Sequence, residues 1–109
     1  MNASGLIRGY LAKNVETEDF LTHVTTTIQR QLQEWDEHYK VKVETCPGHS
    51  FLITIHVNTP IYKVVLSQEE VQMNQEKGPY ALDRLIWREL QVQGMVILYS
   101  PGNYLAHVL

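Results

Sequence analysis

The sequence predicts an α+β fold, with an antiparallel sheet and two helices packed on one face. Two segments with apolar residues at helical spacing, and several short segments in which apolar and polar residues alternate, favour this class. The predicted element order is αβββαββ, and each apolar face in that order needs another element to cover it. With 109 residues, the chain has the length of one domain. We therefore expect a single domain over residues 1–109, beginning with an N-terminal segment over residues 1–16.

The first helix is predicted near residues 17–39. Its apolar residues fall within an arc of about 120° on a helical wheel, which is typical of a helix that packs on one face. They are Phe20, Leu21, Val24, Ile28, Leu32, Trp35 and Tyr39. Gln31 is the one clearly polar residue within this arc. Before this helix, residues 4–13 are candidates for a short helix with Ser4 as its cap.

Three strands are predicted next. Residues 39–46 alternate between apolar and polar side chains, as a half-buried strand does. Pro and Gly within residues 46–49 favour a turn, because Pro presets φ at one central position and Gly accepts a positive φ at the next. Residues 51–57 and 61–66 are the second and third strands, separated by a turn at residues 58–60. Because both turns are short, the three strands are expected to be antiparallel.

The second helix is predicted to begin at Ser67, because Ser67 and Glu70 match a capping box. Gly78 and Pro79 restart the helix, since Pro is favoured at the first helical position. Gly94 ends it. The apolar stripe of this helix consists of Leu82, Leu85, Ile86 and Leu90.

The chain is predicted to end in a β-hairpin. Residues 95–99 and 104–109 are mostly apolar, and Ser, Pro, Gly and Asn at residues 100–103 favour a turn between them. The predicted core comprises Phe20, Val24, Ile28, Leu32, Trp35, Val41, Val43, Ile53, Ile55, Val64, Leu82, Ile86 and Leu90.

Composition limits the classes of function. Nine Lys plus Arg against twelve Asp plus Glu give a net charge of −3, which argues against a dedicated nucleic-acid or membrane-surface binder. Cys46 is the only cysteine, so no intramolecular disulfide forms, as in proteins of a reducing compartment. No signal peptide is visible, and the longest apolar run, residues 95–99, is too short to span a bilayer. We expect a cytoplasmic protein.

Catalytic and metal-binding patterns are weak. Cys46 and His49 have a spacing found in zinc sites, and His56 follows on the next strand, but a structural zinc site needs four ligands. We therefore predict no metal ion and no cofactor. The sequence has no G-x-S-x-G, no Gly-rich phosphate loop and no H-E-x-x-H. A non-enzymatic protein is the leading interpretation, and a small enzyme of unknown class is an alternative.

The second helix carries the strongest candidate for a partner-binding site. Tyr80, Arg84 and Trp87 lie one turn apart outside the arc of the apolar stripe, so a cation–π stack is available to them. Tyr, Trp and Arg dominate binding hot spots. We therefore predict a protein-interaction or regulatory module, with a protein partner on these residues and on neighbouring Arg88 and Gln91. The alternative is that the C-terminal hairpin or the N-terminal segment covers this strip.

Lysines on the outer face of the sheet support a second function, nucleic-acid binding. Lys40, Lys42 and Lys63 are expected on the face opposite the core, together with His56. Phosphate groups bind to clusters of this kind. The net acidity of the chain favours the other interpretation, in which these lysines form a solvated face that keeps the strands soluble.

Two topological resemblances follow from the order of elements. Over residues 17–93, αβββα resembles the double-stranded-RNA-binding domain, which places a run of lysines at the start of its second helix. Residues 77–83 hold no such run, so that family's phosphate-binding residues are not carried over. The full order αβββαββ resembles the dimeric chaperones of type III secretion, which implies a protein partner.

A homodimer is also expected. Leu52, Ile61 and Val65 share the outer sheet face with the lysines, and residues 104–109 are apolar to the end. An apolar terminal strand is an aggregation hazard unless it is paired or covered. Pairing across a two-fold axis would protect it with identical surfaces.

Overall fold

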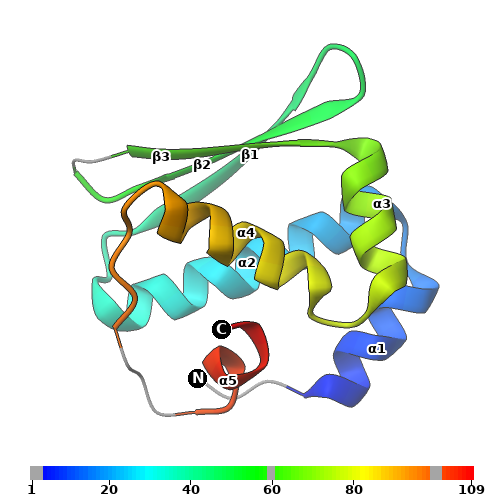
Figure 1. Cartoon of the computed structure of the whole chain (residues 1–109), viewed down its shortest axis with the longest axis horizontal. Coiled ribbons are helices and arrows are strands. Elements are labelled where there is room, and N and C mark those ends of the chain that lie inside the picture. The colour runs from blue at the N-terminus through cyan, green and yellow to red at the C-terminus, as the bar shows by residue number, and fades with distance from the viewer. Residues whose placement is uncertain (1–3, 59–60, 99–101) are drawn as a thin grey trace.

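Five helices and a three-stranded antiparallel sheet make up the described part of the chain (Figure 1). The structure is a computed structural model and describes residues 4–58, 61–98 and 102–109. The elements are α1 (Gly5–Asn14), α2 (Thr17–Trp35), β1 (Lys40–Cys46), β2 (Ser50–His56), β3 (Ile61–Ser67), α3 (Gln68–Lys77), α4 (Ala81–Val92) and α5 (Tyr104–Val108). The predicted α+β class and antiparallel sheet are confirmed. The predicted turns at 58–60 and 100–103 lie partly outside the described residues.

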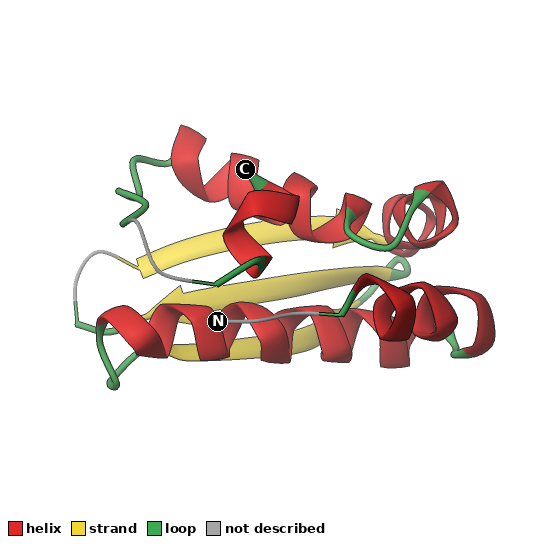
Figure 2. Cartoon of the chain, turned by 90° about the horizontal axis from the view of Figure 1, so that it is seen from below, coloured by secondary structure: helices red, strands yellow, loops and turns green. Residues whose placement is uncertain are grey.

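The helices lie on one side of the sheet (Figure 1). Seen from below, α2 and α4 run side by side across the sheet (Figure 2). Helix α5 lies beneath them, on the side away from the sheet, and α1 lies at the same level. The molecule therefore has three layers, and the helices of the middle layer are covered from both directions.

Helix α2 ends at Trp35, four residues before the predicted end. The Asp36 side chain accepts a hydrogen bond from the backbone N–H of His38 at 2.9 Å. This local hydrogen bond stabilises a turn at residues 36–38, which competes with continuation of the helix. The chain then enters β1 at Lys40, so Tyr39 connects the two elements and is only half-buried against the core.

The core lies between the sheet and helices α2 and α4. Of the predicted core residues, Trp35, Val41 and Val43 are only partly buried but still pack against it. The buried ones are Phe20, Val24, Ile28, Leu32, Ile53, Ile55, Val64, Leu82, Ile86 and Leu90. Strand β2 is central in the order β1-β2-β3, and its inward side chains are buried. The helical and alternating patterns therefore predict most of this interface.

Helices α3 and α4 replace the single interrupted helix of the prediction. The capping box is present: the Ser67 side chain accepts from the Glu70 N–H, and the Glu70 carboxylate accepts from the Ser67 N–H, both at 3.0 Å. A break at Gly78 separates α3 from α4, as predicted, but α4 begins at Ala81 and not at Pro79.

The predicted C-terminal hairpin is wrong. The described residues 95–98 form no strand, and Tyr104–Val108 is the short helix α5. Tyr104, Leu105 and Val108 are buried, at the i, i+1 and i+4 spacing of one helix face. So short an apolar run fits a strand or a helix equally well, and packing against α4 decides between them.

Glutamine side chains cover backbone groups at both edges of the sheet. Gln93 accepts from the Lys63 N–H at 3.3 Å and donates to the Lys63 carbonyl at 2.7 Å. On the opposite edge, Gln29 accepts from the Val41 N–H at 2.8 Å. Edge strands with unpaired backbone groups invite pairing with other chains, and these amides occupy the position of a missing strand.

Gln31 is a buried polar residue whose side-chain amide has no hydrogen-bond partner in the described part of the chain. Its side chain is 0% exposed, and neither its oxygen nor its nitrogen has a hydrogen-bond partner among the described residues. Because an unsatisfied buried polar group costs free energy, Gln31→Met should raise the free energy of unfolding by about 1–3 kcal/mol in urea titrations. Gln91→Met, on the exposed face of α4, should change it by less than about 0.5 kcal/mol. A destabilised Gln31→Met would show that water satisfies the amide.

Candidate functional site

The two aromatic residues of the predicted partner-binding strip are buried. Trp87 is 0% exposed and Tyr80 is 5% exposed. The indole of Trp87 packs edge-on against Trp35, with ring centroids 5.9 Å apart, and its N–H donates to the Tyr104 hydroxyl at 3.0 Å. The expectation that Trp87 and Tyr80 face solvent is therefore wrong, because the C-terminal and N-terminal segments cover this flank of α4.

The remaining strip residues have different surroundings. Arg84 donates from Nη1 to the His107 carbonyl at 2.9 Å, which holds α5 against α4. The predicted stack of Arg84 on Tyr80 is replaced by Arg8, whose guanidinium carbon lies 5.0 Å from the Tyr80 ring centroid. Arg88 and Gln91 are exposed, and a partner on them stays a prediction.

A buried polar network joins four helices, α1, α2, α4 and α5, beneath this strip. Arg8 of α1 forms an ion pair with Asp83 of α4, and Arg8 Nη2 donates to the Thr27 hydroxyl at 3.2 Å. The Tyr104 hydroxyl of α5 donates to Asp83 at 2.6 Å. The sequence analysis missed this network because its members are far apart in the chain and follow no periodic pattern.

Burial sets the electrostatics of the network. Burial raises the pKa of Asp83, and the attraction of Arg8 opposes that rise. Burial, together with the Asp83 carboxylate, raises the pKa of Tyr104 well above its ordinary value. Arg8 is 3% exposed and Asp83 is 0% exposed, so the network is enclosed and holds helices together instead of presenting groups to a substrate.

The four residues of the predicted basic cluster do come together on the outer face of the sheet. Lys40 lies opposite His56 in the register of β1 and β2. Thr54 lies between Lys42 on β1 and Lys63 on β3, one row further along. The alternation of β-strands places all four side chains on the face away from the helices (Figure 1).

This outer face combines positive charge with exposed apolar side chains. Ile61 is 54% exposed and Val65 is 66% exposed. Three of the nine Lys and Arg residues lie on it, but only one of the twelve Asp and Glu residues, Glu44. The Lys42 ammonium lies 3.4 Å from the Glu44 carboxylate. The face is therefore basic in a chain that is acidic as a whole.

The structure separates His56 from Cys46 and His49, the other two residues of the weak zinc pattern. Cys46 pairs with Ser50 at one end of the sheet, whereas His56 pairs with Lys40 at the other end. His49 lies in the intervening turn, with φ of 58°. Among residues 4–58, 61–98 and 102–109, no three His, Cys, Asp or Glu side chains are grouped so that they could hold a metal ion.

The helices of the described ranges are all too short or too polar to cross a membrane. The resemblance to type III secretion chaperones loses its topological basis, because the two final strands do not form. Comparison with protein families, with curated proteins and with solved structures finds no match to this chain.

Proposed function

We propose that the protein is a non-enzymatic interaction module that binds an acidic segment of a partner protein on the outer face of its sheet. The observation that carries this proposal is the pairing of lysines with exposed Ile61 and Val65 on a face that no described helix covers. Carboxylates of the segment would meet Lys40, Lys42 and Lys63, and its apolar side chains would cover Ile61 and Val65. Complementary charge favours encounter and selects the partner.

The size of the face favours a segment over a large partner domain. Three strands of seven residues span roughly 14 Å by 23 Å, from the usual strand spacing and rise per residue. That area is far below the ~800 Å² per partner that stable protein complexes bury. A short peptide can be accommodated on such a face, with affinity from a few charges and aliphatic contacts.

The predicted homodimer keeps only part of its basis. Because residues 104–108 form a buried helix, the apolar terminal strand that motivated the dimer is absent. Leu52, Ile61 and Val65 remain on the outer face as a surface for a second copy. We keep the homodimer as an alternative occupant of this face, and light scattering coupled to gel filtration tests it.

Nucleic-acid binding remains the second candidate, favoured by the grouping of Lys40, Lys42, His56 and Lys63. Single-stranded nucleic acids are usually bound by stacking bases on aromatic side chains. The outer face of strands β1 to β3 carries no Phe, Tyr or Trp. Exposed Ile61 and Val65 gain nothing from a phosphate backbone, so the acidic segment fits this face better.

Lys63→Glu should weaken binding of an acidic peptide at least about tenfold, because it reverses one charge on the outer face. A fluorescein-labelled peptide of alternating Leu and Glu, followed by fluorescence polarisation, provides the measurement. Lys77→Glu, at the exposed end of α3, carries the same charge change away from the face and should leave binding unchanged.

Equal binding of the two variants, or equal binding of a Leu–Lys peptide, would contradict the proposal. Tighter binding of duplex RNA or DNA than of the acidic peptide, with a steep dependence on salt, would replace it with the nucleic-acid function.

A further inference from the structure

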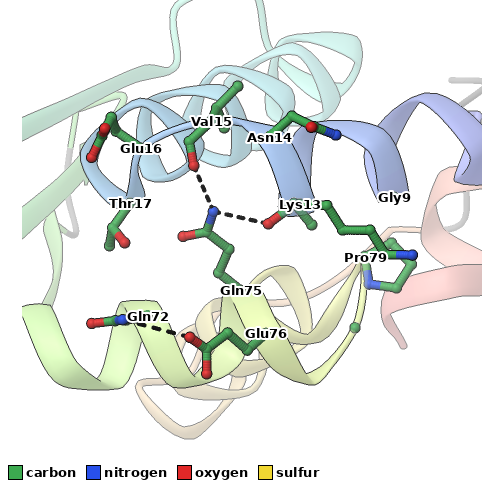
Figure 3. Close-up of a pocket in the computed structure, with 12 residues that line it drawn as sticks. Gly9, Lys13, Asn14, Val15, Glu16, Thr17, Gln72, Gln75, Glu76 and Pro79 are labelled. Atoms are coloured by element: carbon green, nitrogen blue, oxygen red, sulfur yellow. Dashed lines mark hydrogen bonds between the residues drawn. The ribbon is translucent and has the colours of Figure 1, made fainter.

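A groove lies where the end of α1 and the start of α2 pass α3, away from the outer sheet face (Figure 3). Its volume is about 620 Å³. Residues from both walls line it, among them Val15, Glu16, Thr17, Gln72, Gln75 and Glu76. The groove is large enough for a small organic ligand, and its charge and hydrogen-bonding groups limit which one.

Gln75 is a buried polar residue in the wall of this groove, and hydrogen bonds hold its side chain in place. Its side chain is 7% exposed, and Nε2 donates to the carbonyls of Ala12 at 3.0 Å and Val15 at 2.9 Å. Both amide hydrogens are therefore in use. The opposite orientation would place the amide oxygen against two carbonyl oxygens, so the hydrogen bonds determine the orientation of this amide.

The Gln75 oxygen is left with no hydrogen-bond partner among the described residues. Figure 3 shows this oxygen turned toward Thr17, across the groove. A buried acceptor without a donor costs free energy, and a ligand that supplies an N–H would recover it. Since the nitrogen is fully used, the ligand group that meets Gln75 must be a donor.

Charges around the groove favour a cationic donor. Glu16 and Glu76 line it against one lysine, Lys13. The first turn of α2 adds the carboxylates of Glu18 and Asp19, which disfavour an anion at this helix N-terminus. Since no three metal-ligating side chains are grouped in the described chain, an organic cation fits better than a metal ion.

We infer that the groove binds a primary alkylammonium group, which donates to Gln75 Oε1 between the carboxylates of Glu16 and Glu76. The aliphatic stem would lie against Pro79, which lines the same groove. A free polyamine and a lysine side chain share this chemistry. This site shares no residue with the sheet face, so it does not depend on the proposed function.

Titration of the full chain with n-butylammonium chloride, followed by ¹⁵N NMR, tests the inference. We expect saturable shifts of the Gln75 side-chain amide and the Thr17 backbone amide, and none with sodium butyrate at equal ionic strength. Spermidine and Nα-acetyl-lysine amide, titrated in parallel, distinguish a polyamine from a lysine side chain by which binds more tightly.

Two charge variants set the expected direction. Glu76→Gln should weaken n-butylammonium binding at least about threefold, and Lys13→Gln should strengthen it. Glu69→Gln, on the same helix but outside the groove, should leave affinity unchanged. The inference is overturned if n-butylammonium gives no saturable shift, which would mean that water alone satisfies Gln75. Equal shifts with butyrate, or equal effects of Glu69→Gln and Glu76→Gln, would also overturn it.

Discussion

Replacing Arg8 with methionine should lower the free energy of unfolding by about 3–5 kcal/mol, because it leaves the Asp83 carboxylate buried without its cation. The hydrogen bond from Arg8 to Thr27 and the stack on Tyr80 are lost as well. Urea unfolding followed by circular dichroism at pH 7 gives the measurement. Arg88→Met, at an exposed position of α4, is the matched control and should change stability by less than about 0.5 kcal/mol.

A second substitution separates the ion pair from packing. Asp83→Asn alone should also destabilise the protein, since it leaves Arg8 buried beside a neutral amide. In the variant that combines Arg8→Met with Asp83→Asn, neither charge remains. Its loss of unfolding free energy should therefore be well below the sum of the losses in the two single variants. Additive losses would show that Arg8 and Asp83 act independently and that the ion pair contributes little.

The Arg8→Met variant should also depend on pH in a defined direction. Burial already raises the pKa of Asp83, and loss of Arg8 removes the attraction that opposes this rise. The folded state then binds a proton more tightly than the unfolded state, so stability falls as pH rises above the unfolded pKa. The variant should therefore lose less stability, relative to the wild type, at pH 4.5 than at pH 7. A loss independent of pH would mean that Asp83 is not the group left unpaired.

Trp87→Ala should lower the free energy of unfolding by about 3–5 kcal/mol, the cost of removing a large aromatic side chain from a packed interior. The change removes the edge-on contact with Trp35 and leaves the Tyr104 hydroxyl without the indole donor. Thermal unfolding of Trp87→Ala against Gln91→Ala, an exposed position on the same helix, provides the comparison.

Intrinsic fluorescence gives an independent measurement of the same residue. In a Trp35→Phe background, the emission of Trp87 should be blue-shifted and protected from iodide, because its ring is fully enclosed. A red-shifted, easily quenched signal, together with an unchanged melting temperature for Trp87→Ala, would show that Trp87 is exposed to solvent. The partner-binding strip would then regain its aromatic anchor.

Local sequence patterns predicted the helices and strands that bury only one face. The stripe from Phe20 to Leu32 and the alternation along β2 each place apolar side chains at the period of their own element, so the buried face can be found without knowing what covers it. The capping box at Ser67 and Glu70 is equally local, because both hydrogen bonds close within three residues.

The candidate sites were predicted unevenly for the same reason. Lys40, Lys42, His56 and Lys63 were placed on one face because strand alternation and short turns determine register. The groove at Gln75 could not be predicted, since the Gln75 amide donates to two carbonyls that lie 60 and 63 positions away in the sequence.

The sequence by itself determined the α+β class, the three strands and the apolar faces of α2 and α4, since these depend on interactions between residues close in the chain. Tertiary structure alone decided that Trp87 is buried and that residues 104–108 form a helix. The Arg8–Asp83 pair joins residues 75 positions apart, and Tyr104 reaches Asp83 across 21. These contacts bring α1 and α5 over the flank of α4 and bury a surface that helical periodicity leaves open. A short apolar segment takes the conformation that its packing partner allows, and that partner is known only once the chain has folded.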